Sequence, residues 1–191
     1  VNPTPSINTL TLENTFCSGD EIEYNLENNS NGIIPNGTIY DWTSQNINLD
    51  VNDFNITGDE QIYVGVVNNQ TYDIGNISLN ITPYTDYCFG NSINLDINIL
   101  QRPELIVSAN DTICVGEIAQ LYVADLFGNQ ELLYQWSPLE KLDFPYGSLI
   151  TTSPTETSVF TVTTLDPVSG CIASDSIQIT VYSQPFAEIT Y

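Results

Sequence analysis

Residues 93–99 read Ile-Asn-Leu-Asp-Ile-Asn-Ile, with an apolar side chain at every odd position and a polar one at every even position. This strict alternation is typical of a β-strand that buries one face and exposes the other. Alternation of the same kind occurs at residues 22–26, 62–66, 77–81, 160–162 and 177–181. No stretch of 12 residues has the roughly 3.6-residue periodicity of an amphipathic helix. The sequence therefore predicts an all-β protein.

Turn-forming residues separate the alternating segments and keep each strand short. Asparagine or aspartate stands beside glycine at positions 31–32, 36–37, 58–59 and 128–129. Each half of the chain thus yields about seven short strands, which suits a two-sheet antiparallel sandwich. Since a sheet with one apolar face needs a second sheet to cover that face, we expect one β-sandwich in each half.

An internal repeat divides the chain. Residues 17–20 (Cys-Ser-Gly-Asp) match residues 114–117 (Cys-Val-Gly-Glu), and residues 40–43 (Tyr-Asp-Trp-Thr) match residues 134–137 (Tyr-Gln-Trp-Ser). A proline precedes the early cysteine and a second cysteine follows the tryptophan in both copies. Because these features recur in the same order, the two halves are copies of one structural unit.

The repeat fixes the expected domain boundaries. We expect a first domain over residues 1–102, enlarged and rich in asparagine, and a second over residues 103–184. The first 102 residues hold 19 asparagines and the remaining 89 hold two. The sequence of residues 183–189 resembles that of the domain boundary at residues 101–106. Residues 185–191 are therefore interpreted as the start of a following repeat or as a tail. Proline at each short junction favours a semi-rigid rod cut from a longer array.

The charge balance excludes several classes of function. The chain has 24 acidic residues, only Arg102 and Lys141 as bases, and no histidine, which gives a formal charge of −22. Such a surface repels nucleic acid. Without histidine the chain cannot build a Ser-His-Asp or Cys-His catalytic set or a His-ligated zinc site. No apolar run reaches the roughly 18 residues of a membrane span. We therefore expect no catalytic residues, no nucleic-acid partner and no membrane insertion.

Four cysteines, Cys17, Cys88, Cys114 and Cys171, are candidate disulfide partners. Their wide spacing favours structural disulfides and an oxidising, extracytoplasmic compartment. Four cysteines allow three pairings, of which the repeat symmetry favours Cys17–Cys88 and Cys114–Cys171, one bridge inside each domain. Closing loops of this length would stabilise each sandwich by roughly 4 kcal/mol on the loop-entropy account. Buried free thiols are the alternative.

The two tryptophans, Trp42 and Trp136, occupy equivalent positions in alternating segments. An exposed indole could stack on a sugar ring, but a place in the core of each sandwich is the favoured interpretation.

Acidic residues in the first copy form the best candidate for a metal site. Asp50, Asn52, Asp53, Asp59 and Glu60 crowd one insert, and calcium binds six to eight such oxygens. The insert does not have the EF-hand pattern, since Phe54 and Asn55 stand where a ligand and the turn glycine belong. A solvated acidic surface is the alternative. Calcium is thus the only cofactor that the sequence suggests.

The cysteine, Tyr-x-Trp and late-cysteine motifs resemble those of the PKD-like and Ig-like tandem repeats of large bacterial surface proteins. These include gliding-motility adhesins exported by the type IX secretion route. The second copy fits best, through residues 113–117, 134–138, 160–163 and 170–171. The Trp-Asp-Phe-Gly-Asp-Gly core of standard PKD domains is absent, and Asp86 stands where an antibody-type domain has its corner tyrosine. Thr112 and Ser176 each follow an aspartate and precede an isoleucine, which resembles the O-glycosylation signal of bacteria that carry such repeats.

The resemblance implies two tandem Ig-like or PKD-like β-sandwich domains that act as a non-catalytic, rigid and acidic spacer of a bacterial cell-surface adhesin, in adhesion or gliding motility. The implied partners are neighbouring repeats of the same chain and a surface polysaccharide. The alternative is a carbohydrate-binding or accessory module of a secreted, surface-associated protein or hydrolase. In that case residues 44–60 of the enlarged first copy are the candidate sugar-binding segment.

Overall fold

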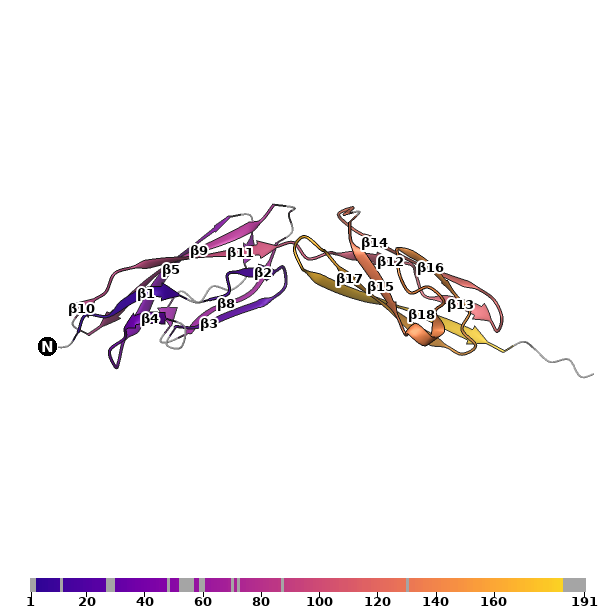
Figure 1. Cartoon of the computed structure of the whole chain (residues 1–191), viewed down its shortest axis with the longest axis horizontal. Coiled ribbons are helices and arrows are strands. Elements are labelled where there is room, and N and C mark those ends of the chain that lie inside the picture. Colours follow the sequence, from indigo (N-terminus) through magenta and orange to yellow (C-terminus); the bar gives the residue numbers. More distant parts are fainter. Residues whose placement is uncertain are drawn as a thin grey trace, which may run out of the picture. The chain divides into compact units, whose positions relative to one another are not determined.

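The computed structural model describes residues 3–10, 12–26, 30–47, 49–51, 57–58, 61–69, 71, 73–86, 88–129 and 131–183. The chain forms two compact units, Val1–Gln101 and Arg102–Tyr191, each of which is considered by itself (Figure 1). Apart from the single 3-10 turn η1 (Leu139–Lys141), the named elements of the described residues are strands. The proposed extra segment at residues 185–191 lies outside the described residues.

The first unit is a sandwich with one large sheet and two small ones. The large sheet runs in the order β2 (Thr15–Cys17), β11 (Ile93–Leu100), β9 (Gly75–Thr85), β5 (Ile39–Ile47) and β7 (Thr57–Gly58), with β10 (Cys88–Phe89) added to β9. Facing it are β3 (Glu21–Asn25), β8 (Gln61–Asn68) and β6 (Asp50–Val51), while β1 (Ser6–Leu10) pairs with β4 (Ser30–Ile33).

The second unit repeats this plan in a smaller form. Its four-stranded sheet has the order β13 (Asp111–Cys114), β18 (Ile172–Tyr182), β17 (Ser158–Leu165) and β15 (Leu133–Ser137). The opposing sheet consists of β12 (Leu105–Val107), β14 (Ala119–Asp125) and β16 (Leu149–Thr152). Both units are Ig-like β-sandwiches, so the predicted all-β fold class is confirmed. One detail differs from a purely antiparallel sandwich, since β2 and β13 pair in parallel with β11 and β18.

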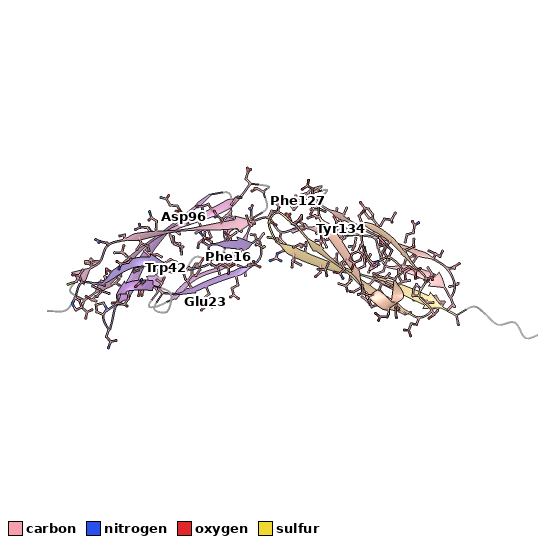
Figure 2. All side chains as sticks on the ribbon, viewed as in Figure 1. Phe16, Glu23, Trp42, Asp96, Phe127 and Tyr134 are labelled. Carbon is pink, nitrogen blue, oxygen red and sulfur yellow. The ribbon has the colours of Figure 1, made fainter. Side chains whose placement is uncertain are left out.

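Each unit has its own core, formed where the apolar faces of its sheets meet. Leu95, Ile97 and Ile99 of the alternating stretch at residues 93–99 point into the core of the first unit, as their alternation predicts. Both predicted core tryptophans are buried: Trp42, labelled in Figure 2, in the first unit and Trp136 in the second. Burial of the two indole rings rules out their role as exposed sugar-stacking platforms.

A β-bulge breaks one of the predicted alternations. The pairing of β3 with β8 advances past Val64, and Gly65 adopts a positive φ of 81°. An extra residue on one strand reverses the faces of the residues that follow. Val66 is consequently 50% exposed and Val67 is fully buried. The expectation that the alternation of residues 62–66 places Val66 in the core is therefore wrong.

The repeated cysteine motif forms the same turn in both units. In the second unit the amide N–H of Cys114 donates to a carboxylate oxygen of Glu117 at 2.7 Å, and the amide of Glu117 donates back to the Cys114 carbonyl at 3.0 Å. Gly116 takes the positive φ of 92° that closes the turn. Cys17, Gly19 and Asp20 repeat the arrangement. The repeated cysteine motif therefore forms a turn that ends a strand.

Gly116→Ala tests the backbone requirement of this turn. No atom lies within 4 Å of an added Cβ, so the cost arises from the left-handed backbone alone. We expect the unfolding free energy of the second unit to fall by about 1–2 kcal/mol in urea denaturation. Gly116→Asn should cost less, because asparagine tolerates this conformation. Equal losses for the two variants would contradict the explanation.

Candidate functional site

The four cysteines differ in chemical state. Cys17 and Cys171 are disulfide-bonded, whereas Cys88 and Cys114 are free thiols. The predicted bridges Cys17–Cys88 and Cys114–Cys171 are therefore both wrong.

The strand pairing of the first unit explains why its two cysteines cannot bond to each other. Cys17 pairs with Leu100, at the level where β9 begins, and Cys88 pairs with Thr85, where β9 ends. In Figure 1, β2 and β10 accordingly lie at opposite ends of the large sheet. At about 3.3 Å per residue the 11 residues of β9 span roughly 30 Å. A disulfide needs Cα atoms about 4.4–6.8 Å apart.

The second unit separates its cysteines in the same way. Cys114 pairs with Tyr182 at the end of β18, whereas Cys171 immediately precedes Ile172, the first residue of that strand. The 11 residues of β18 again place the two sulfur-bearing residues roughly 30 Å apart. Each unit thus carries one cysteine at either end of its longest strands.

We name these ends by the path of the chain. The exit end is where the last strand of a unit stops, beside Cys17 and Leu100 or beside Cys114 and Tyr182. The entry end holds the turn that carries the late cysteine, Cys88 or Cys171.

Two contacts anchor the entry ends to the start of each unit. The Arg102 guanidinium donates a hydrogen bond to the carbonyl of Ile172, next to Cys171. Gly90, two residues after Cys88, lies so close to Pro5 that an added Cβ would be 2.2 Å from the Pro5 carbonyl oxygen. The late cysteine of each unit is therefore held beside the residues with which that unit begins.

Apolar side chains are exposed beside both free thiols. Cys114 is itself exposed, and Ile118 (70% exposed) and Tyr182 (61% exposed) lie at the same exit end. Cys88 is half-buried, and the neighbouring Phe89 is 76% exposed and stacks on Tyr84 with ring centroids 5.6 Å apart. The chain as a whole is strongly acidic, so these exposed side chains form local apolar surfaces beside the two free thiols.

The outer face of the large sheet in the first unit is covered with paired polar side chains. Asn80 donates to Asn94 at 2.6 Å, Ser78 donates to Asp96, and Thr82 and Ser92 share a hydrogen bond of 2.7 Å. Asp96 is labelled in Figure 2. These cross-strand pairs explain why asparagine, serine and threonine alternate with apolar residues in the first copy.

An apolar hollow lies on the second unit. It has a volume of about 480 Å³ and is lined by side chains that include Leu133, Tyr134, Tyr146, Leu165 and Ile172. Tyr134 is labelled in Figure 2; burial, followed by the charge of Asp125, raises the pKa of its phenol. No local sequence pattern reveals this cluster, because the pairing of Gln135 with Tyr146 brings its two tyrosines together.

Most of the candidate calcium site lies outside the described residues. Of its predicted ligands only Asp50 falls within a described strand, β6, while Asn52, Asp53, Asp59 and Glu60 lie outside the described residues. Elsewhere in the described part of the chain, no three His, Cys, Asp or Glu side chains gather closely enough to hold a metal ion.

The two candidate O-glycosylation residues lie on exposed positions of one sheet. Thr112 belongs to β13 and Ser176 to β18, and the amide of each donates to the carboxylate of the aspartate before it at 2.7 Å. Modification at either residue remains a prediction. No helix within the described ranges is long and apolar enough to cross a bilayer.

The phenol of Tyr24 in the first unit has a raised pKa with a clear structural cause. Its hydroxyl donates to the Glu13 carbonyl at 2.6 Å, and its ring packs edge-on against Phe16. Burial, with a further contribution from the charge of Glu13, raises the pKa of Tyr24 far above its ordinary value. The phenol therefore stays protonated in the folded unit under conditions where it ionises in the unfolded chain.

This difference predicts alkaline destabilisation of the first unit. Above pH about 10 the unfolded chain releases a proton that folded Tyr24 retains, so the unfolding free energy falls as the pH rises. Below that pH the contribution of Tyr24 is fully present. We expect Tyr24→Phe to lose stability less steeply between pH about 9 and 11 in urea denaturation. Identical slopes for variant and wild type would contradict this expectation.

No protein-family model and no curated protein matches the chain. Among solved structures, immunoglobulin domains 1–4 of Sidekick-1 are 14% identical, with 95% of this chain and 52% of that chain covered and a TM-score of 0.33. The three N-terminal domains of the bacteriophage RB49 outer capsid protein Hoc are 19% identical, with coverages of 93% and 59% and a TM-score of 0.35. Drosophila N-cadherin EC1-3 is 7% identical, with coverages of 96% and 69% and a TM-score of 0.36.

The chain spans about half the length of the Sidekick-1 structure. The strand pairing of each unit itself carries the fold assignment: the chain is a tandem of two Ig-like β-sandwich units.

Proposed function

We propose that this chain is a non-catalytic repeat segment of a bacterial cell-surface adhesin, and that it acts as an acidic spacer in adhesion or gliding motility. The observation that supports the proposal most is the duplication of one Ig-like unit, including its strand order and its cysteine turn, along a single chain. Repetition of a module extends a molecule without adding a reactive site.

The junction between the units suits a spacer. The strand β11 ends at Leu100 and β12 begins at Leu105, so four residues, among them Pro103, connect the two sandwiches. A short connection that contains proline has little conformational freedom to lose. The disulfide bond further supports an extracellular location, because such bonds persist in oxidising compartments.

The negative surface charge is expected to keep copies of the chain from associating. A net charge of −22 makes neighbouring copies repel one another and discourages exposed strand edges from pairing. Lys141, one of the two bases, bonds to Glu156 at 3.0 Å and to Ser158 at 2.8 Å. The positive charge is therefore engaged locally, and self-repulsion is expected to limit the stability of the spacer at low ionic strength.

A salt titration tests this electrostatic account and the calcium prediction together. We expect the melting temperature to rise by several degrees between low salt and about 0.15 M sodium chloride, where the Debye length is about 8 Å. Calcium at matched ionic strength should raise it further than magnesium if the insert at residues 50–60 binds calcium specifically. A melting temperature that is the same in EDTA, sodium chloride and calcium would contradict both ideas.

Cell-surface labelling tests the proposed function. Antibodies raised against the purified chain should label intact cells of the source organism, and external protease should remove the signal. Deletion of the coding region should reduce attachment or spreading of the cells. A cytoplasmic control protein must stay unlabelled in the same cells. Labelling only after permeabilisation would refute the proposal.

Carbohydrate binding is a second candidate function, and the apolar hollow of the second unit favours it. Tyrosine rings offer an apolar face and a hydroxyl, the combination that suits a sugar. Tyr146 is 55% exposed there, and Gln135 and Thr163 add polar groups to the lining. The hollow lies on the second unit, whereas the segment expected from the sequence, residues 44–60, belongs to the first.

A glycan array followed by calorimetry with the strongest binder tests this second function. Tyr146→Ala should weaken binding about threefold to tenfold through the loss of ring contacts, whereas Tyr146→Phe should retain most of the affinity. Tyr182→Ala removes an exposed tyrosine outside the hollow and serves as the matched control. The absence of any binding glycan would leave the spacer as the better explanation and count against the hollow as a sugar site.

A further inference from the structure

We propose that Asn36 is a site of spontaneous covalent modification, at which water converts its side-chain amide to an acid as the protein ages. The chain contains two Asn-Gly pairs, Asn31-Gly32 and Asn36-Gly37. Glycine has no Cβ, so in such a pair its main-chain nitrogen has open access to the asparagine side chain. The structure places the two pairs in opposite backbone settings, and only one of these settings leaves the reacting groups free to meet.

Asn36 and Gly37 are the middle residues of an exposed turn. The amide N–H of Thr38 donates to the Pro35 carbonyl at 3.1 Å, and Gly37 adopts a positive φ of 80°. This is the arrangement of a type II turn, in which glycine is favoured at the third position. Both middle residues are exposed, and no atom lies within 4 Å of the place that a Cβ on Gly37 would take. The turn therefore leaves the Gly37 nitrogen accessible.

The two reacting groups of this turn are also not engaged by other described residues. Within the described part of the chain, neither the side-chain amide of Asn36 nor the main-chain N–H of Gly37 takes part in a hydrogen bond. A turn residue lies outside the strand ladders, so its main chain rotates at low cost. The Asn36 side chain and the Gly37 nitrogen can therefore approach each other without breaking an existing bond.

The other Asn-Gly pair is held in a strand. Asn31 and Gly32 belong to β4 and pair with Thr9 and Ile7 of β1 (Figure 1). Gly32 packs so closely against β1 that an added Cβ would be 2.0 Å from the Ser6 carbonyl oxygen. Ring closure requires the main chain at the asparagine to rotate, and a residue in a strand pair cannot rotate unless the pair opens. The reaction at Asn31 therefore needs local unfolding first.

The reaction needs only water as a co-reactant. The Gly37 nitrogen loses its proton to hydroxide and attacks the side-chain carbonyl carbon of Asn36. The new C–N bond closes a five-membered imide, and the side-chain amide nitrogen leaves as ammonia. Water then adds to one of the two imide carbonyls and opens the ring. Opening at the side-chain carbonyl gives aspartate, and opening at the main-chain carbonyl gives isoaspartate, whose main chain runs through the former side chain.

The isoaspartate product should destabilise the first unit. It lengthens the main chain by one carbon at residue 36, within the turn that leads into β5. Thr38 is buried in this turn, and its hydroxyl donates to the Pro35 carbonyl at 2.7 Å. Tyr40, two residues later, belongs to the core. The extra carbon separates the Pro35 carbonyl from both of its donors on Thr38 and so loosens the start of β5.

The modification site is specific to the first unit. Asn36 and Gly37 lie four and three residues before the tyrosine of the repeated Tyr-x-Trp motif, and the same positions in the second copy, residues 130–131, are Gln-Glu. An ageing molecule should therefore lose stability in one of its two units and keep it in the other.

Peptide mapping of the full chain after incubation in mildly alkaline buffer tests the proposal. Mass spectrometry follows the conversion of amide to acid at each site, and an isoaspartyl methyltransferase assay detects isoaspartate. In the folded chain we expect Asn36 to react about tenfold faster than Asn31 or more, since opening the pair of β1 with β4 at a cost of about 1.4 kcal/mol already gives this ratio. In denaturing urea the two rates should become comparable. Equal rates in the folded chain, or a faster reaction at Asn31, would overturn the proposal.

Two variants connect the modification to stability. Asn36→Gln keeps the amide but would have to close a six-membered ring, so its urea midpoint should stay constant during the incubation in which the wild-type midpoint falls. Asn31→Gln is the matched control and should age like the wild type. Circular dichroism before incubation checks that both variants are folded. An unchanged wild-type midpoint after most of Asn36 has become isoaspartate would refute the predicted loosening of β5.

Discussion

Trp136→Ala is expected to destabilise the second unit strongly. The indole is fully buried, and its N–H donates to the Gly147 carbonyl at 3.0 Å. Truncating such a side chain removes its apolar contacts and leaves a cavity, a loss of about 3–5 kcal/mol. A whole domain is stable by only about 5–15 kcal/mol, so this loss is a large share of the stability of the second unit and should lower its urea midpoint markedly.

The two tryptophans allow each unit to be followed separately. In Trp136→Ala the remaining fluorescence comes from Trp42, which belongs to the core of the first unit and should report an unchanged urea transition. Trp42→Ala is the matched variant. Its remaining fluorescence comes from Trp136 and should report an unchanged urea transition of the second unit. A shift of the urea transition that the remaining tryptophan reports, in either variant, would contradict the presence of two independent cores.

Much of the fold could be predicted from local patterns. The alternation of residues 93–99 identifies a strand and its buried face because neighbouring side chains of a strand point to opposite sides. Trp42 and Trp136 were placed in the core for the same reason. Val66 was misplaced because a bulge adds one residue to a strand, and the preceding alternation does not reveal it; only Gly65 gave a local signal.

The cysteine pairing could not be predicted because a repeated spacing does not show which end of a sheet holds each cysteine. That placement follows from the pairing of Cys17 with Leu100 and of Cys88 with Thr85. The tyrosines of the apolar hollow were missed for a related reason, since their proximity arises from an irregular connection.

The placement of unlike cysteines at opposite ends of a unit has a consequence for assembly symmetry. A contact between two different surfaces is heterologous and, unless its rotation closes a ring, it propagates as an open filament. A self-complementary contact would instead stop at a dimer. The two ends of a unit differ, as Cys17 at the exit end of the first unit differs from Cys88 and Phe89 at its entry end, so a contact between an exit end and an entry end would join two unlike surfaces and have a direction.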